Sequence, residues 1–492
     1  MYENSVQRED VVWVAANPSL ASATRVVVHP ELLQLYGNDM SVLVEALAVP
    51  IPLIDADEDV SRALLPVERG EAVDSVVFEY QTQSFHSYSI GMQEYVAAFM
   101  QAADASGWLP GIEVSIKRTE FFPFDFKDAH KGTMVESTRE LVESLISIGK
   151  DREEEEKEDD ENQQDDDPSV RIIATFPIPY REAIASSHPV LVFATIELMH
   201  PSLPAAKAQR APHFPPHVGF LTPSSWSATG LAAWGVPRDQ IYVVPHTVDT
   251  SVFTPFSEED RATLRKELNF EGKLVFLSVG SMTDNKNPKL LIEAFVEFVN
   301  ADLENRLLNA VLILKGSGMY KGIGEEVQTL VDEIKKQGAQ IVLTWSDVEV
   351  EGMVQMYAAA DAYIAPYKYE GFNLPPLEAI ACGTPAIVTS GGATDAYMHE
   401  DVGIRIPSLV EAGKHPQTGR PYYFHYPANA SVIVEAMEQI AATRPRVPQS
   451  ALDWVDANFG HEAVGAGLAA AINDLTQSAT QATVSSPSRD EL

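Results

Sequence analysis

The residues best suited to chemistry are two glutamates, Glu370 and Glu378, with seven residues between them. Pro375 and Pro376 lie in this interval, and proline is favoured where a helix begins because the first helical N–H groups have no intrahelical partner. We therefore expect a loop that holds Glu370, followed by a helix whose first turn contains Glu378. The N–H groups at such a helix start attract anions, and here they belong to Phe372, Asn373 and Leu374.

This arrangement suits a ligand that carries both phosphates and hydroxyl groups. The helix start would hold phosphate, while Glu378 would accept hydrogen bonds from ribose hydroxyls. Glu370, with Gly371 beside it in the loop, would accept hydrogen bonds from sugar hydroxyls. The alternative is that Glu378 is a favourable acid near a helix start and Glu370 a solvated loop residue. For either glutamate taken alone, this structural interpretation is the better one.

The two glutamates follow Ala362–Ala365, one of several apolar runs of strand length in the second half of the chain. These runs lack two-residue alternation, which is typical of parallel strands covered on both faces, and helical stretches such as Pro288–Val299 separate them. The pattern predicts a doubly wound sheet, which binds ligands at the carboxyl ends of its strands. The other runs are Leu274–Val279, Val311–Lys315, Ile341–Thr344 and Pro385–Thr389.

The first half of the chain shows a similar alternation of strands and helices. Helical stretches lie around Met92–Ala103 and Thr138–Ile148. The fold class that follows is α/β, with two Rossmann-like doubly wound domains. The apolar runs of the first half are Val11–Ala15, Arg25–Val28, Val76–Tyr80, Ile112–Ile116, Val170–Thr175 and Val190–Thr195.

The expected N-terminal domain covers residues 1–246 and the expected C-terminal domain residues 247–449, with a hinge at Val244–Asp249. Residues 450–475 predict closing helices, and residues 476–492, rich in Ser, Thr, Gln and Ala, predict a disordered tail. An acidic insert occupies about residues 150–168. Its core, residues 151–167, holds 12 acidic and two basic residues, a net charge of −10. Such a run cannot form an apolar core, so we expect it to be disordered.

Composition limits the partners and the compartment. The net charge of −36 disfavours nucleic acid and anionic lipid, because both repel a negative surface. No apolar stretch approaches the roughly 20 residues of a transmembrane segment, and the polar N-terminus does not resemble a signal peptide. A single cysteine, Cys382, fits a reducing compartment. The final Arg489-Asp490-Glu491-Leu492 resembles an endoplasmic-reticulum retention signal, but without an entry signal we expect a cytoplasmic protein.

The segment EGFNLPPLEAIACGTPAI, which begins at Glu370 and follows ADAYIAPYKY, resembles the retaining glycosyltransferases of family 4, also called group 1. The likeness extends over most of the second half and includes Leu277–Lys286 and Met356–Asp361. It is thinner in the first half, at Leu221–Trp226 and Pro245–Asp249. The resemblance implies the B-type fold, two Rossmann-like domains facing across a cleft. It also implies transfer of a sugar from a nucleoside diphosphate sugar to an acceptor glycan, lipid or small molecule.

The resemblance also implies roles for the matching residues. Lys286 and Glu370 would be the catalytic residues: Lys286 would neutralise the donor diphosphate, and Glu370 would orient the sugar. Glu378 and the N–H groups after Gly280 would bind the donor. Ser281 stands where family members often carry arginine, so either another cation substitutes for it or donor binding is weaker.

Metal and further cofactors are not expected, because Lys286 and the helix start supply the positive charge for the nucleoside diphosphate sugar. Asp55-Ala56-Asp57 resembles a metal-binding Asp-x-Asp, but a solvated turn is the preferred interpretation. Gly91 and His86 are weaker candidates for a substrate loop, and for Gly91 an ordinary helix entry is an equal alternative. Two other functions stay open: a non-catalytic nucleotide-sugar-binding scaffold, favoured by Ser281, and a sugar-nucleotide epimerase.

Overall fold

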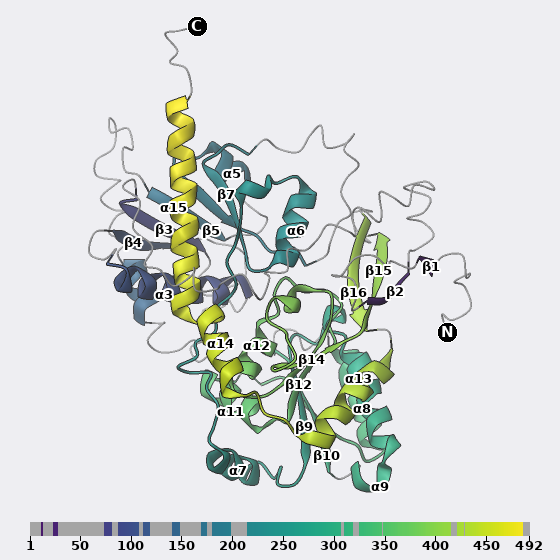
Figure 1. Cartoon of the computed structure of the whole chain (residues 1–492). Coiled ribbons are helices and arrows are strands. Elements are labelled where there is room, and N and C mark those ends of the chain that lie inside the picture. The colour runs from purple at the N-terminus through teal and green to yellow at the C-terminus, as the bar shows by residue number, and fades with distance from the viewer. Residues whose placement is uncertain are drawn as a thin grey trace. The chain divides into compact units, whose positions relative to one another are not determined.

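The computed structural model describes residues 11–12, 23–27, 73–80, 87–107, 112–118, 140–147, 169–174, 180–197, 214–306, 309–317, 324–346, 348–414, 421–427 and 429–485. Within these residues the strands form two six-stranded parallel sheets and one four-stranded sheet (Figure 1). Helices connect the parallel strands, so the predicted α/β fold with two Rossmann-like sheets is confirmed.

The sheet of the second half contains every strand that the sequence predicted there, and one more, β14. Its order is β11-β10-β9-β12-β13-β14. In chain order this is the 3-2-1-4-5-6 arrangement of the Rossmann fold, which reverses direction between its first and fourth strands. A ligand crevice is therefore expected at the carboxyl ends of β9 and β12. The strands are β9 (Leu274–Val279), β10 (Ala310–Lys315), β11 (Gln340–Thr344), β12 (Ala362–Ala365), β13 (Ala386–Thr389) and β14 (Gly403–Ile406).

Helices with apolar faces cover this sheet. In α8, apolar residues at three- and four-residue steps are fully buried, among them Leu291, Phe295 and Phe298. Phe298 meets Phe276 of β9 edge to face, with ring centroids 5.5 Å apart. A fully buried side chain of this size contributes about 1.5–3 kcal/mol to folding. The helices are α7 (Glu258–Glu267), α8 (Pro288–Ala301), α9 (Leu303–Arg306), α10 (Glu325–Lys335), α11 (Val350–Ala359), α12 (Leu374–Ala381) and α13 (Ala430–Thr443).

A buried carboxylate fixes the amino ends of β9 and β12. Asp361, which directly precedes β12, is 4% exposed and accepts hydrogen bonds from Arg261 at 3.0 Å and Arg265 at 3.2 Å. It also accepts the backbone N–H of Val275 in β9 at 2.8 Å. Because its partners come from α7 and β9, this one side chain ties the helix to two adjacent strands. A buried charge with so many partners is satisfied rather than reactive.

The sheet of the first half has the order β4-β3-β5-β6-β7-β8. It includes β7 and the three-residue β8, which the sequence analysis did not identify as strands. Its helices include α3 (Ser87–Ala105), α5 (Tyr180–Ala185) and α6 (Ser225–Trp234), and residues 140–147 are also helical. The strands are β3 (Ser75–Tyr80), β4 (Glu113–Arg118), β5 (Ser169–Ala174), β6 (Val190–Phe193), β7 (Val218–Thr222) and β8 (Ile241–Val243).

The C-terminal helix α15 (His461–Ser485) completes the core of this first sheet. It packs along α3, and both helices lie beside the sheet in Figure 1. Val464, Leu468 and Ile472 are buried in one cluster with Phe78 of β3 and Phe99 of α3. The closing helices expected at 450–475 are α14 (Gln449–Phe459) and α15, and α15 continues through Ser485 into the region expected to be a tail.

The N-terminal strands differ from the expectation. The runs near Val11 and Arg25 were expected in the sheet of the first half. Instead, β1 (Val11–Val12) and β2 (Ala23–Val27) belong to the four-stranded sheet, of order β1-β2-β15-β16. Here β2 runs parallel to β15 (Ser408–Lys414), which forms a hairpin with β16 (Pro421–Pro427). Apolar patterning identifies a strand but not its partner, which explains the error.

By their contacts, the residues fall into two units. One unit holds the described residues within 54–195, 206–249 and 456–492, and the other holds the described residues within 1–53, 196–205 and 250–455. The chain thus passes between units directly after the expected hinge segment Val244–Asp249, and again within α14. The Thr247 hydroxyl and the Val248 N–H both donate to the Phe459 carbonyl at 2.8 Å, which holds the two crossing segments together. No helix in the described ranges is both long and apolar enough to cross a membrane.

Within the first unit, an ion pair joins α15 to α3. His461 Nε2 lies 2.9 Å from Glu94 Oε2, and both side chains are mostly buried. Burial lowers the pKa of His461, but the hydrogen bond to Glu94 and the negative charges of Glu94 and Asp249 outweigh it. The pKa therefore lies above its ordinary value of 6.5. The pair stabilises the fold below that ordinary value, and the contribution is lost as the pH rises through the raised pKa.

We predict that His461→Gln destabilises the protein in acid but not in alkali. The melting temperature should fall by roughly 2 °C or more at about pH 5.5, where the histidine is charged, and hardly at all at about pH 8.5. Calorimetry of wild type and variant across this range tests the sign. Glu94→Gln should remove the same pH dependence, and a constant difference at all pH values would contradict the assignment.

Candidate functional site

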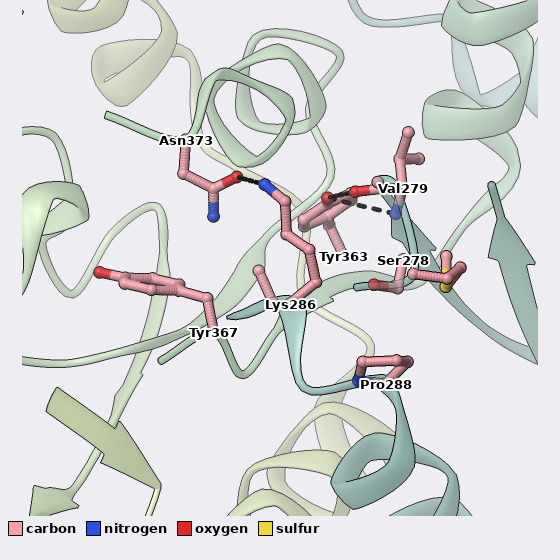
Figure 2. A pocket seen from close by; sticks show the side chains of 10 residues that line it. Ser278, Val279, Lys286, Pro288, Tyr363, Tyr367 and Asn373 are labelled. Atoms are coloured by element: carbon pink, nitrogen blue, oxygen red, sulfur yellow. Dashed lines mark hydrogen bonds between the residues drawn. The ribbon is translucent and has the colours of Figure 1, made fainter. Parts of the chain in front are cut away.

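The candidate site lies where the strand order of the second sheet reverses. After β9 the chain passes Gly280 and the short helix η6 (Asp284–Lys286), and after β12 it passes Glu370 and enters α12. Lys286 Nζ forms an ion pair with Glu370 and donates a long hydrogen bond to Asn373 Oδ1 at 3.4 Å (Figure 2). The side chains of Lys286 and Glu370 are 23% and 9% exposed. The structure thus brings together residues that the sequence placed in one site from segments more than eighty positions apart.

Gly280, in the loop after β9, leaves room for the stem of the Lys286 side chain. A Cβ there would lie 3.3 Å from Cε and 3.4 Å from Cδ of Lys286, tighter than an ordinary contact. The lysine stem therefore lies along the glycine backbone. Asn287, which follows Lys286, has a φ of 55°, and Pro288 then begins α8. This left-handed residue, a conformation that asparagine tolerates, ends η6 and fixes the direction from which Lys286 enters the site.

The loop after β12 ends in the same way. Asn373 is the N-cap of α12 and has a φ of 67°. Tyr397, which follows the short helix η8 (Ala393–Ala396), donates its hydroxyl to the Asn373 carbonyl at 2.6 Å. Its ring packs against Phe372, with centroids 5.3 Å apart. The start of α12 is therefore held from the neighbouring strand connection as well as by its own sequence.

Helix α12 begins at Leu374, as Pro375 and Pro376 predicted. The prediction that Glu378 lies in its first turn is wrong, because the helix starts at Leu374 and its first turn contains no acidic residue. Glu378 is half-buried one turn further along. Its role in binding a ribose therefore depends on the direction of its side chain rather than on the helix start.

A tyrosine orients Glu378. The hydroxyl of Tyr357 in α11, a fully buried residue, donates to Glu378 Oε2 at 2.5 Å. Burial, and next the negative charge of Glu378, raise the pKa of Tyr357 well above its ordinary value. The phenol therefore stays protonated and acts as a donor. Sequence reasoning assigned no role to Tyr357, because a single aromatic residue in an apolar helix is typical of a core position.

Two further tyrosines, Tyr363 and Tyr367, line the site. Tyr363 of β12 accepts the Val279 N–H at 3.2 Å and donates to the Val279 carbonyl at 2.9 Å, which joins the carboxyl ends of β9 and β12. Tyr367 hydrogen-bonds Thr394 Oγ1 at 2.8 Å. Burial is the main cause that raises the pKa of both tyrosines. They line a small pocket together with Lys286 and Asn373 (Figure 2).

Ser281 does not replace the positive charge of an arginine. Its hydroxyl lies 2.8 Å from that of Thr283, which in turn donates to Asn285 Oδ1 at 2.5 Å. Lys368, on the facing loop, is paired with Asp284 at 2.8 Å. The loop after β9 is therefore ordered by its own polar side chains. Lys286 is the one cation of this loop that lines the pocket in the described structure.

The remaining predicted residues lie elsewhere or cannot be placed. Gly91 lies inside α3, in the first unit, rather than in a loop that precedes a helix. His86, Asp55–Asp57, the acidic run and the final Arg489–Leu492 fall outside the described residues. Cys382 is buried at the end of α12, with the left-handed Gly383 after it. Among the described residues, no group of three His, Cys, Asp or Glu is placed to hold a metal ion.

Comparison with known sequences identifies the region that carries the site. Residues 260–409 match the model of the family "Glycosyl transferases group 1". The chain is 31% identical over 196 residues to mannosylfructose-phosphate synthase of Agrobacterium fabrum, covering 37% of this chain and 42% of that protein. It is 31% identical over 175 residues to D-inositol 3-phosphate glycosyltransferase of Acidothermus cellulolyticus, covering 35% and 38%. The chain therefore matches less than half the length of these relatives.

Comparison with solved structures extends over both sheets. A glycosyltransferase of Rickettsia africae aligns with a TM-score of 0.56 at 14% identity, covering 82% of this chain and 99% of that one. Sucrose-phosphate synthase of Thermosynechococcus elongatus aligns with a TM-score of 0.54 at 16% identity, covering 84% and 100%. The chain thus has the B-type glycosyltransferase fold. The site lies within residues 260–409, the part of the chain that matches the group 1 glycosyltransferase model.

The ion pair in the site yields a prediction about stability. Lys286→Met removes the partner of Glu370, whose carboxylate is left almost fully buried. We expect a loss of about 1–3 kcal/mol in unfolding free energy, below the cost of a fully buried pair because Lys286 is partly solvated. Denaturant unfolding of wild type and variant measures this difference in unfolding free energy. Adding Glu370→Gln should restore most of the loss, and a double variant no more stable than Lys286→Met would contradict the pairing.

Proposed function

We propose that this protein is a retaining glycosyltransferase that moves a sugar from a nucleoside diphosphate sugar to an acceptor. The observation that carries the proposal is the meeting of Lys286 and Glu370 beside the start of α12, at the point where the strand order reverses. A cation and a helix start suit phosphate, and a carboxylate suits sugar hydroxyls. The match of residues 260–409 to the group 1 glycosyltransferases supports the same assignment.

In the proposed reaction, the bond between the anomeric carbon and the diphosphate oxygen breaks. Positive charge develops on the sugar and negative charge on the leaving diphosphate. Lys286 and the N–H groups at the start of α12 stabilise the diphosphate where its charge grows. Glu370 accepts hydrogen bonds from the sugar and favours its cationic character. These groups supply the charge that the leaving group needs, so we propose that the reaction requires no metal.

Retention of configuration follows if the acceptor enters on the face from which the diphosphate leaves. The acceptor oxygen then forms the new bond to the anomeric carbon, and its proton passes to an oxygen of the departing phosphate. No protein nucleophile is needed for this sequence. Glu370 has a positioning task in it, because its carboxylate is already engaged by Lys286.

The nucleoside is held, in this proposal, by Glu378. The hydrogen bond from Tyr357 fixes one oxygen of the carboxylate and so sets the direction of the other toward ribose hydroxyls. The names of the two curated relatives point to phosphorylated small molecules as substrates. Their likeness covers only 37% and 35% of this chain, so a glycan, a lipid and a small molecule are all retained as acceptor classes.

A non-catalytic nucleotide-sugar-binding protein is the second candidate. The observation that favours it is Ser281, whose hydroxyl hydrogen-bonds Thr283 and adds no positive charge to the phosphate side of the pocket. A binding protein would share the nucleotide affinity but not the turnover. Release of nucleoside diphosphate from the sugar conjugate in the presence of acceptor mixtures separates the two candidates.

The donor site is tested by calorimetric binding of UDP, GDP and ADP. One of them should bind selectively, and Glu378→Ala should weaken it roughly 10-fold or more. Tyr357→Phe should weaken it roughly 3- to 10-fold, because the carboxylate loses its fixed direction. The matching 2′,3′-dideoxy nucleotide should bind wild type and Tyr357→Phe equally. The control is Tyr242→Phe, which removes a 2.8 Å hydrogen bond to Asp474. Both residues lie in the unit that does not hold the site, so this variant should bind the nucleotide as wild type does.

Turnover is tested with the sugar conjugate of the nucleotide that binds. Glu370→Gln should reduce kcat by about 100-fold or more while the affinity for the bare nucleoside diphosphate changes little. Proton NMR of the product should show the same anomeric configuration as the donor, and EDTA should leave the rate unchanged. Inversion, or complete loss of activity in EDTA that Mg²⁺ restores, would overturn the proposed mechanism.

A further inference from the structure

The side-chain amide of Asn373 has a defined orientation. Its oxygen faces Lys286 Nζ at 3.4 Å. An ammonium group has only donors, so the amide oxygen and not the nitrogen must face it. The amide nitrogen therefore points away from the lysine, into the space on the side of Tyr367 (Figure 2).

This amide nitrogen is a buried donor without a partner. Asn373 is 7% exposed, and its Nδ2 has no hydrogen-bond partner among the described residues. A buried donor of this kind is unfavourable, and most native proteins satisfy it with protein, water or ligand. Three features surround it: the Lys286 ammonium, the start of α12 and the pocket that Asn373 itself lines. All three favour an acceptor that carries negative charge.

The left-handed backbone at position 373 is a second explanation for an asparagine there. At a φ of 67°, glycine and asparagine are the residues that fit best. If backbone shape were the whole reason, glycine would serve equally well, and the amide would be incidental. The hydrogen bond from Tyr397 to the Asn373 carbonyl holds this backbone independently of the side chain. Replacing Asn373 with glycine therefore separates a role of the backbone conformation from a role of the side-chain amide.

We propose that the Asn373 side-chain amide is a specific ligand of the donor diphosphate, donating through Nδ2 to an oxygen of the phosphate that bears the sugar, next to Lys286. The amide oxygen stays on Lys286 and keeps its ammonium directed at the same phosphate. Asn373 thus adds a neutral hydrogen-bond donor to a pocket in which Lys286 is the only cation among the described lining residues. The inference rests on the proposed function, since it assumes that a nucleoside diphosphate occupies this pocket.

The test compares mono- and diphosphates. Asn373→Gly keeps the backbone conformation and removes the amide. It should weaken the selected nucleoside diphosphate, among UDP, GDP and ADP, roughly 10- to 100-fold, the range of a hydrogen bond to a charged group. The corresponding monophosphate should bind as in wild type, because the second phosphate is absent. Asn373→Asp, which adds a negative charge beside the phosphate, should weaken the diphosphate further.

The matched control is Asn269→Gly. Asn269 has a φ of 58° and lies exposed after α7. Asn269→Gly therefore makes the same replacement in the same backbone conformation, but away from the pocket. Its affinities should equal those of wild type, and thermal melting should show both glycine variants folded. Equal diphosphate affinity in Asn373→Gly and wild type would overturn the inference. So would an equal loss for mono- and diphosphate, or a loss confined to the sugar conjugate. If wild type binds no nucleotide, the proposed function itself fails.

Discussion

The ion pair between Lys286 and Glu370 is the interaction on which the site depends. It joins the connection after β9 to the connection after β12, where the strand order of the second sheet reverses. Neither residue is rigid by itself. Lys286 is directed by the turn at Asn287 and lies along the backbone of Gly280, and Glu370 is held by its ion pair with Lys286. The ion pair holds the two loops together and fixes the positions of its positive and negative groups.

The rest of the unit supports this surface from both ends of the same two strands. At the amino ends, Asp361 gathers Arg261, Arg265 and the Val275 N–H. At the carboxyl ends, Tyr363 bonds to both backbone groups of Val279. A buried carboxylate and a buried phenol are each costly when unsatisfied, so a slip of either strand would be strongly disfavoured. The spacing of the two loops is thereby fixed before any ligand arrives.

Sequence reasoning reached most of this architecture because continuous apolar runs and paired prolines have local physical meaning. It located α12 through Pro375 and Pro376, and it placed Glu370 at the carboxyl edge of a strand. It could not find the hydrogen bond from Tyr357 to Glu378, because a contact between two helices depends on how they pack and not on the pattern of residues within either helix. It also assigned the run near Arg25 to the wrong sheet, because pairing is decided by the hairpin β15–β16, far along the chain.

The position of α15 has a consequence for the order in which the protein is made. This helix supplies Val464, Leu468 and Ile472 to the core of the first unit, yet it is the last described element of the chain. The strands from β9 to β14 are all synthesised before it. On the ribosome, the unit that holds the site can therefore assemble its six-stranded sheet before the core of the first unit is complete. The apolar side of α3 stays uncovered until α15 has been made, as a temporary surface for chaperones or for aggregation.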